Sequence, residues 1–487
     1  MSVLFRGVFI VNGTGEKPYR GDVLIKEDKI AAIGKIPEYK AEKIIEANDL
    51  FLSPGFIDLD SRSDFISSIF KDRQQKYYME QGITTAVLGQ AGASLAPMFG
   101  LQENVRKTWS PEILNFDWNS FEEFAEKMKG KRFGVNFYSL IGQANIRNVI
   151  LGEKEKGEAT ENEIRALRGL ARKSLREGAK GISFGMGYPY SLINPISETR
   201  AILEEIFKEE KIASFDTGGM TEEEIKKNIS FFLREMRRIG KKGKFFARQI
   251  RKREIEWLER GKSLQEIYAS FNPKGIEIFP VRFLLPKEIK REKIKDIKQI
   301  SEREDILEKI NLETGKLKIF DDFCKKKHYE GKNFKDLGKN NKERKIKLLT
   351  ILKEINFEGL IIEKKEEEEK EKELIKKKTI FLTAIANIEE TRDTFTSFIK
   401  ESFIKGEKIE KIIEKITSSP AKASGLKNIG EIKEGNEADV VLFNKAGEIK
   451  HLVVGGVLSI ENGKITGRLG GKIKKDENIR KEKIRWF

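Results

Sequence analysis

Charged side chains directly follow three short apolar runs of this chain, at spacings that could support chemistry. Asp60, Arg62 and Asp64 follow the first run, Asp216 follows the second and Arg248 follows the third. Carboxylate oxygens are ligands for Mg²⁺ or Mn²⁺, so an oxygen-ligand metal site is one interpretation. A guanidinium keeps its proton and repels a cation. We favour the other interpretation, in which the two arginines form fixed ion pairs with Asp60 and Asp216.

Histidine and cysteine are scarce in this chain. Its 487 residues include 2 histidines, His328 and His451, and 1 cysteine, Cys324. These counts exclude an intrachain disulfide framework, a multi-cysteine zinc site and any metal centre built on three imidazoles. Cys324 and His328 lie in a lysine-rich segment, and His451 starts an apolar run of the C-terminal part. We therefore expect structural or surface positions for these three residues.

Strands that alternate with helices are expected to position the charged side chains. The expected strands cover residues 56–59, 84–88, 135–140, 181–184, 211–215, 244–247, 276–281 and 379–385. Apolar residues recur on one face of 161–177, 222–239 and 408–416, which predicts helices. Eight such strands predict an α/β fold of the (β/α)8 TIM type, in which chemistry gathers at the carboxyl ends of the strands.

Both ends of the chain have a different texture from its centre. Short alternating runs are separated there by turn signals such as Asn-Gly, which is typical of an antiparallel sheet. Neither end is long enough for a core of its own, so we expect 1–53 and 420–475 to form one small β-sandwich domain. The barrel is expected at 54–419, with a charged helical insertion at about 287–375 and a basic tail at 476–487.

The chain is strongly basic, with 94 Lys and Arg against 78 Asp and Glu and a formal net charge of +16. Both signs are interleaved in runs such as 363–373, which is typical of a solvated surface and disfavours a nucleic-acid footprint. Residues 1–12 alternate in polarity, unlike a signal peptide. No run approaches the roughly 18 apolar residues of a membrane helix. We expect a cytoplasmic protein without a membrane partner.

Several motifs in order along the chain resemble one known family. They lie at 53–64 (SPGFIDLDSRSD), 82–85, 89–97 (GQAGASLAP), 178–185 (GAKGISFG), 188–189 (YP), 329–332, 417–421 (TSSPA), 430–435, 438–443 (ADVVLF), 454–456 and 461–464. This series is similar to the N-acyl-D-amino-acid deacylase (D-aminoacylase) branch of the amidohydrolase superfamily. The resemblance runs along nearly the whole chain and implies a barrel that hydrolyses an amide by zinc-activated water.

The chain departs from the family at the residues that the resemblance implies for metal binding. The family has two histidines after the first strand, where this chain has Asp60 and Arg62. Its cysteine after the second strand corresponds to Ala91. Its histidine after the fifth strand corresponds to Phe215 or Asp216, and its histidine after the sixth strand falls near Arg248. The segment 380–390, where the family's proton-shuttling aspartate belongs, contains no Asp. We therefore expect no zinc cofactor and a degenerate metal site.

Two features of the family's substrate pocket survive. Tyr188 matches its Tyr-Pro motif, and Arg392 roughly matches an arginine that would bind the substrate carboxylate. The favoured hypothesis is a catalytically degenerate deacylase homologue that binds a small carboxylate ligand or a partner chain. Two alternatives stay open: an active hydrolase with a substitute oxygen-ligand metal site at Asp60 and Asp216, and a basic nucleic-acid-binding protein.

Overall fold

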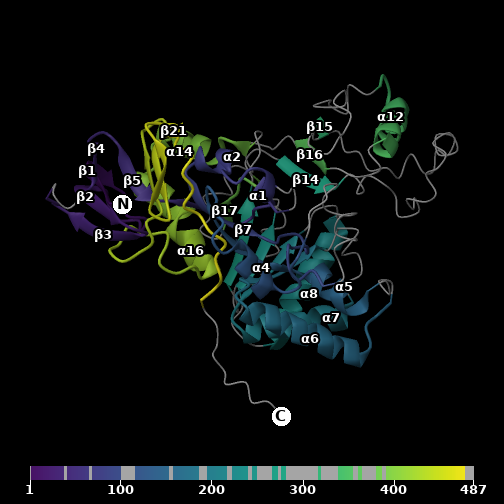
Figure 1. Ribbon diagram of the computed structural model, residues 1–487. Coiled ribbons are helices and arrows are strands. Elements are labelled where there is room, and N and C mark those ends of the chain that lie inside the picture. The colour runs from purple at the N-terminus through teal and green to yellow at the C-terminus, as the bar shows by residue number, and fades with distance from the viewer. Residues whose placement is uncertain are drawn as a thin grey trace, which may run out of the picture.

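In the computed structural model, the chain folds into parallel and antiparallel β-sheets with helices around them (Figure 1). The described residues are 2–37, 41–64, 68–99, 116–152, 157–185, 195–216, 222–239, 244–248, 266–271, 276–280, 316–319, 338–354, 360–364, 380–386 and 391–477. Within these ranges, no helix is both long and apolar enough to cross a membrane. Cys324 and His328 lie outside the described residues.

Strands from the N-terminal and C-terminal parts of the chain join into one nine-stranded sheet. These strands are β1 (Ser2–Ile10), β2 (Tyr19–Lys26), β3 (Lys29–Gly34), β4 (Lys43–Glu46), β5 (Phe51–Pro54), β18 (Val440–Phe443), β19 (Ile449–Val454), β20 (Val457–Glu461) and β21 (Lys464–Ile465). β5 links the two halves, because it pairs with β1 on one side and antiparallel with β18 on the other. One buried apolar cluster includes residues from both halves, such as Phe5 and Leu442. His451 lies buried on β19.

Parallel strands make up the centre of the molecule. They are β6 (Phe56–Asp58), β7 (Ile83–Leu88), β8 (Asn136–Ser139), β9 (Ile141–Gly142), β10 (Gly181–Gly185), β11 (Ile212–Asp216), β12 (Lys244–Arg248), β13 (Glu266–Phe271) and β17 (Ile380–Leu382). Their ladders run β6-β7-β8 and β9-β10-β11-β12-β13-β17. Only Leu140 separates β8, the last strand of the first ladder, from β9, the first strand of the second.

The expected seventh parallel strand at 276–281 was placed wrongly. β13 at Glu266–Phe271 lies between β12 and β17, whereas β14 (Ile276–Pro280) pairs antiparallel with β16 (Leu360–Lys364). β15 (Lys316–Ile319) completes this separate sheet. Both candidate runs suit a strand locally, and only their long-range pairing distinguishes them.

The described helices, except the one at Asn341–Glu354, follow parallel strands along the chain. They are α1 (Ser68–Lys71), α2 (Lys76–Met79), α4 (Phe121–Met128), α5 (Gln143–Leu151), α6 (Glu161–Arg176), α7 (Ile196–Lys208), α8 (Glu222–Ile239), α12 (Asn341–Glu354), α14 (Thr394–Ile404), α15 (Ile409–Ile416) and α16 (Ser418–Ser424). The predicted helices at 161–177, 222–239 and 408–416 are confirmed as α6, α8 and α15. A capping box between Thr160 and Glu163 fixes the start of α6.

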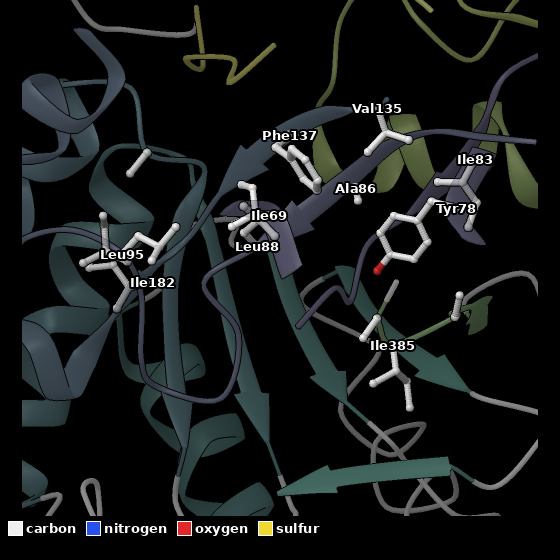
Figure 2. Packing of buried hydrophobic residues seen from close by; sticks show 14 of the residues in the cluster. Ile69, Tyr78, Ile83, Ala86, Leu88, Leu95, Val135, Phe137, Ile182 and Ile385 are labelled. Atoms are coloured by element: carbon white, nitrogen blue, oxygen red, sulfur yellow. The ribbon is translucent and has the colours of Figure 1, made fainter. Parts of the chain in front are cut away.

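The parallel strands separate two buried apolar layers. Figure 2 shows part of the larger one, which includes Ile83, Leu88 and Ile182. On β11, Ala213 and Phe215 belong to this layer. Ile212 belongs instead to a second layer that also contains Ala421 and Ala423 of α16. Successive residues of a strand point to opposite faces. The position of a residue along the strand therefore decides which of the two apolar layers its side chain joins.

Candidate functional site

Four charged side chains meet at the carboxyl ends of the parallel strands. We call Asp60, Arg62, Asp216 and Arg248 the ion-pair cluster. Arg62 Nη2 lies 2.9 Å from Asp216 Oδ2, and Arg248 pairs with both Asp216 Oδ2 and Asp60 Oδ1. None of the four side chains is more than 2% exposed. The structure therefore joins side chains that are far apart in the sequence into one buried cluster.

Strand register explains why two members of the ion-pair cluster are neighbours. Asp216 and Arg248 are the last residues of β11 and β12, and these parallel strands place them directly opposite each other. The side-chain alternation resolves the choice between Phe215 and Asp216. The Phe215 ring packs 4.9 Å from the Phe232 ring of α8, so Phe215 faces the helices while Asp216 faces the ion-pair cluster.

The turn after β6 positions the other two members. Asp58 Oδ1 accepts the backbone N–H of Asp60 at 2.9 Å, and Asp58 Oδ2 accepts the backbone N–H of Ala384 at 3.0 Å. The Arg62 backbone N–H donates to the carbonyl of Ile385. These bonds tie the segment after β6 to the segment after β17. They also fix the direction in which Asp60 and Arg62 leave the strand.

Two hydroxyl groups near the ion-pair cluster were missed by sequence reasoning. Ser270 Oγ donates to Asp60 Oδ2 at 2.6 Å, and Thr383 Oγ1 donates to the Asp60 carbonyl at 3.1 Å. Ser270 is the penultimate residue of β13, which was not recognised as a parallel strand. A correct seventh strand would have pointed to Ser270, because side chains at the carboxyl ends of such strands converge.

Burial dominates the electrostatics of the site. It raises the pKa of Asp60 above its ordinary value, while the positive charges of Arg248 and Arg62 act in the opposite direction. Burial also raises the pKa of Asp58 to about 7. Charged groups removed from water need close partners. The two guanidinium groups supply these partners for Asp60 and Asp216.

The residues present do not fit a divalent cation. Arg248 contacts both Asp60 and Asp216, so its guanidinium lies where a bridging cation would have to lie. Ala91 is buried with a methyl side chain, which has no atom that coordinates a metal. In the part of the chain that the structure describes, no group of three or more His, Cys, Asp or Glu side chains is arranged to hold a metal ion.

The structure does not test the roles predicted for the two substrate-pocket residues. Tyr188 lies outside the described residues. Arg392 is described and lies exposed just before α14, whereas the ion-pair cluster is buried. Their roles stay predictions.

Comparisons with known proteins find sequence similarity over parts of the chain. Residues 380–459 match the model of the amidohydrolase family. The D-aminoacylase of Alcaligenes xylosoxydans xylosoxydans is 28% identical over 206 residues, which cover 42% of this chain and 40% of that protein. The chain thus matches about two fifths of that relative's length.

The solved structures match over nearly the whole chain. A crystal structure of D-aminoacylase has a TM-score of 0.78 at 20% identity and covers 97% of this chain and 99% of its own. The N-acyl-D-glutamate deacylase of Bordetella bronchiseptica, complexed with zinc and a phosphonate inhibitor, has a TM-score of 0.74 at 16% identity, covering 97% and 98%. At these identities the likeness concerns the fold.

Proposed function

We propose that the chain is a homologue from the D-aminoacylase branch of the amidohydrolase superfamily in which fixed ion pairs have replaced a metal centre. The matches to the amidohydrolase family, to D-aminoacylase and to N-acyl-D-aspartate deacylase support this proposal. On this proposal it has lost metal-dependent hydrolysis of the amide in N-acyl-D-amino acids. The observation that carries the proposal is the contact of Arg248 with both Asp60 and Asp216. A guanidinium cannot give up its proton to make room for a cation.

We also propose that the parallel strands close into a (β/α)8 barrel, with β8 and β9 counted as one strand. Closure would place β6 beside β17. The bonds from the Arg62 and Ala384 backbone across the two strand ends support this arrangement. The domain boundaries at 53 and 420 and the insertion at about 287–375 are part of the same proposal. A closed barrel explains how side chains from β6, β11 and β12 reach one cluster.

The proposed ligand is a small carboxylate, bound without turnover. Arg392 supports this choice through its type alone, because a bidentate guanidinium suits a carboxylate. The expected result is a rise in melting temperature with N-acetyl-D-amino acids, larger than with the L-enantiomers and reduced in Arg392→Gln. This part of the proposal would be contradicted if the D- and L-enantiomers gave equal shifts in melting temperature, if neither gave a shift, or if Arg392→Gln left the shift unchanged.

Metal content and turnover test the loss of hydrolysis. Purified protein is incubated with Zn²⁺, Mn²⁺ or Mg²⁺, desalted and measured for bound metal, and it is assayed for D-amino acid release from N-acetyl-D-amino acids. We expect no stoichiometric metal and no release. Stoichiometric metal with turnover that disappears in Asp60→Asn, but not in the matched surface variant Asp117→Asn, would overturn the proposal. Asp117 suits this control because its side chain is 61% exposed.

A further inference from the structure

Three lysines line the edge of the parallel sheet that lies opposite the ion-pair cluster. Lys180 and Lys211 immediately precede β10 and β11, and Lys244 is the first residue of β12. The register pairs Gly181 with Ile212 and Ile212 with Lys244, so the three lysines, which we call the floor lysines, are neighbours. Lys180 and Lys211 are each only 3% exposed. Burying like charges together is unfavourable unless a counter-charge accompanies them.

One carboxylate supplies a counter-charge for the floor lysines. Asp476 Oδ2 lies 2.6 Å from Lys211 Nζ and 3.2 Å from Lys180 Nζ, and the Asp476 side chain is 6% exposed. Backbone carbonyls near the end of α16 accept further bonds, from Lys180 to Gly425 at 2.8 Å and from Lys244 to Lys422 at 3.0 Å. Burial lowers the pKa of Lys180 to about 8, and Asp476 acts against this shift. Asp476 is the first residue of the expected basic tail, and its side chain is buried.

Asp476 lies near the end of a segment that crosses the edge of the sheet. We call residues 471–477 the C-terminal strap. The N–H of Gly471 donates to Phe133 at 2.8 Å, the N–H of Lys474 to Phe137 at 2.7 Å and the N–H of Asp476 to Gly178 at 2.8 Å. At Gly178, an added Cβ would lie 2.7 Å from the Cβ of Lys475, so the glycine permits this close approach. The strap therefore docks through backbone bonds and is anchored near its end by a charge.

We propose that Lys180 and Lys211 form a carboxylate-binding site whose occupant is the chain's own Asp476, and that this pairing is the latch that holds the C-terminal strap. The site binds the anion through two ammonium groups, on the residues that immediately precede the adjacent strands β10 and β11. Because Asp476 fills it, an external carboxylate gains access only when Asp476 is removed. The strap then opens as a unit, since its backbone bonds continue into the latch.

Hydrogen exchange of the strap amides tests the latch. Asp476→Asn keeps the side-chain volume and removes the charge, and the matched control is Glu477→Gln, because Glu477 is an exposed neighbouring carboxylate. We expect the backbone N–H groups at positions 474 and 476 to exchange at least about tenfold faster in Asp476→Asn than in the control, since hydrogen bonds to charged groups contribute more than about 1.4 kcal/mol. Equal exchange in both variants would overturn the proposal.

Two further measurements test the proposal, and the first of them retains Asp476 and so serves if Asp476→Asn does not fold. Lys211→Gln removes the partner at 2.6 Å and leaves Lys180, so we expect a smaller acceleration at the same amides. In Asp476→Ala, sodium acetate is compared with sodium chloride at equal ionic strength. Acetate should raise the melting temperature of this variant more than that of the wild type, because only the variant has room for it. An equal effect of acetate on both proteins, or none, would refute occupancy by Asp476.

Discussion

Replacing Arg248 by methionine tests the central electrostatic argument. Arg248 contacts both Asp60 and Asp216, whereas Arg62 pairs with Asp216 at 2.9 Å. In Arg248→Met, Asp216 keeps a guanidinium partner, and Asp60 keeps the hydroxyl of Ser270. Removing one partner of a buried ion pair typically destabilises a protein by about 3–5 kcal/mol, because the remaining charge is left in a region without water.

An exposed ion pair gives the matched control. Arg165 lies 3.9 Å from Glu161, and the two side chains are 74% and 93% exposed. Arg165→Met removes the same chemical groups, but water replaces the lost partner, so we expect a loss of at most about 1 kcal/mol. Urea unfolding followed by tryptophan fluorescence measures both variants, with the midpoint compared at constant slope.

A second substitution separates electrostatics from packing. Asp60→Asn in the Arg248→Met background removes the carboxylate that lost its partner. We expect the double variant to be more stable than Arg248→Met alone, which is a coupling of the kind that neighbouring residues show. The reasoning is refuted if Arg248→Met costs no more than Arg165→Met. It is also refuted if Asp60→Asn lowers the stability further in the double variant.

Two other predictions concern the outer face of the parallel sheet. The hydrogen bonds from Arg200 and Arg238 hold the pKa of Glu235 at about 2, below its ordinary value of 4.5. A carboxylate whose pKa is lowered by folding stabilises the folded state fully at pH values above its unfolded pKa. The wild type should therefore be more stable than Glu235→Gln above about pH 4.5, and this difference should vanish as the pH falls towards about 2. Urea unfolding midpoints at several pH values measure it. Phe215→Ala should destabilise by about 3–5 kcal/mol, because it empties a buried ring position beside Phe232; a loss below about 1 kcal/mol in the same assay would mean that the ring does not face the helices.

Local periodicity explains the parts of the fold that the sequence predicted correctly. α6 and α8 have apolar residues on one face over more than three turns, and α6 also has a capping signal in Thr160 and Glu163. The strands at 181–184 and 211–215 are short apolar runs flanked by helices, and they appear as β10 and β11. Such features depend on neighbouring residues alone.

Pairing between distant segments explains what could not be predicted. A shift of one residue moves every side chain of a strand to the other face, so the sequence left Phe215 and Asp216 as alternatives until the ladder with β12 fixed the register. β13 and β14 lie four residues apart, and only their partners β17 and β16 separate them. Ser270 was missed for the same reason.

The candidate site was predictable in its charges but less so in its surroundings. Arginine and aspartate types at strand ends were enough to expect ion pairs between them. The hydrogen bonds of Asp58 to two backbone N–H groups depend on how β6 meets the segment after β17. The C-terminal strap has no apolar alternation, so its docking through Asp476 had no local signal.

The position of β5 in the nine-stranded sheet has a consequence for synthesis on the ribosome. β5 needs β18 as its second partner, and roughly 390 residues separate these strands. At about 5–20 residues per second, that edge of β5 waits roughly 20–80 s for its partner to emerge. An unpaired strand edge readily pairs with other chains. We therefore expect the newly made first half to aggregate more readily than the finished chain until β18 has been synthesised.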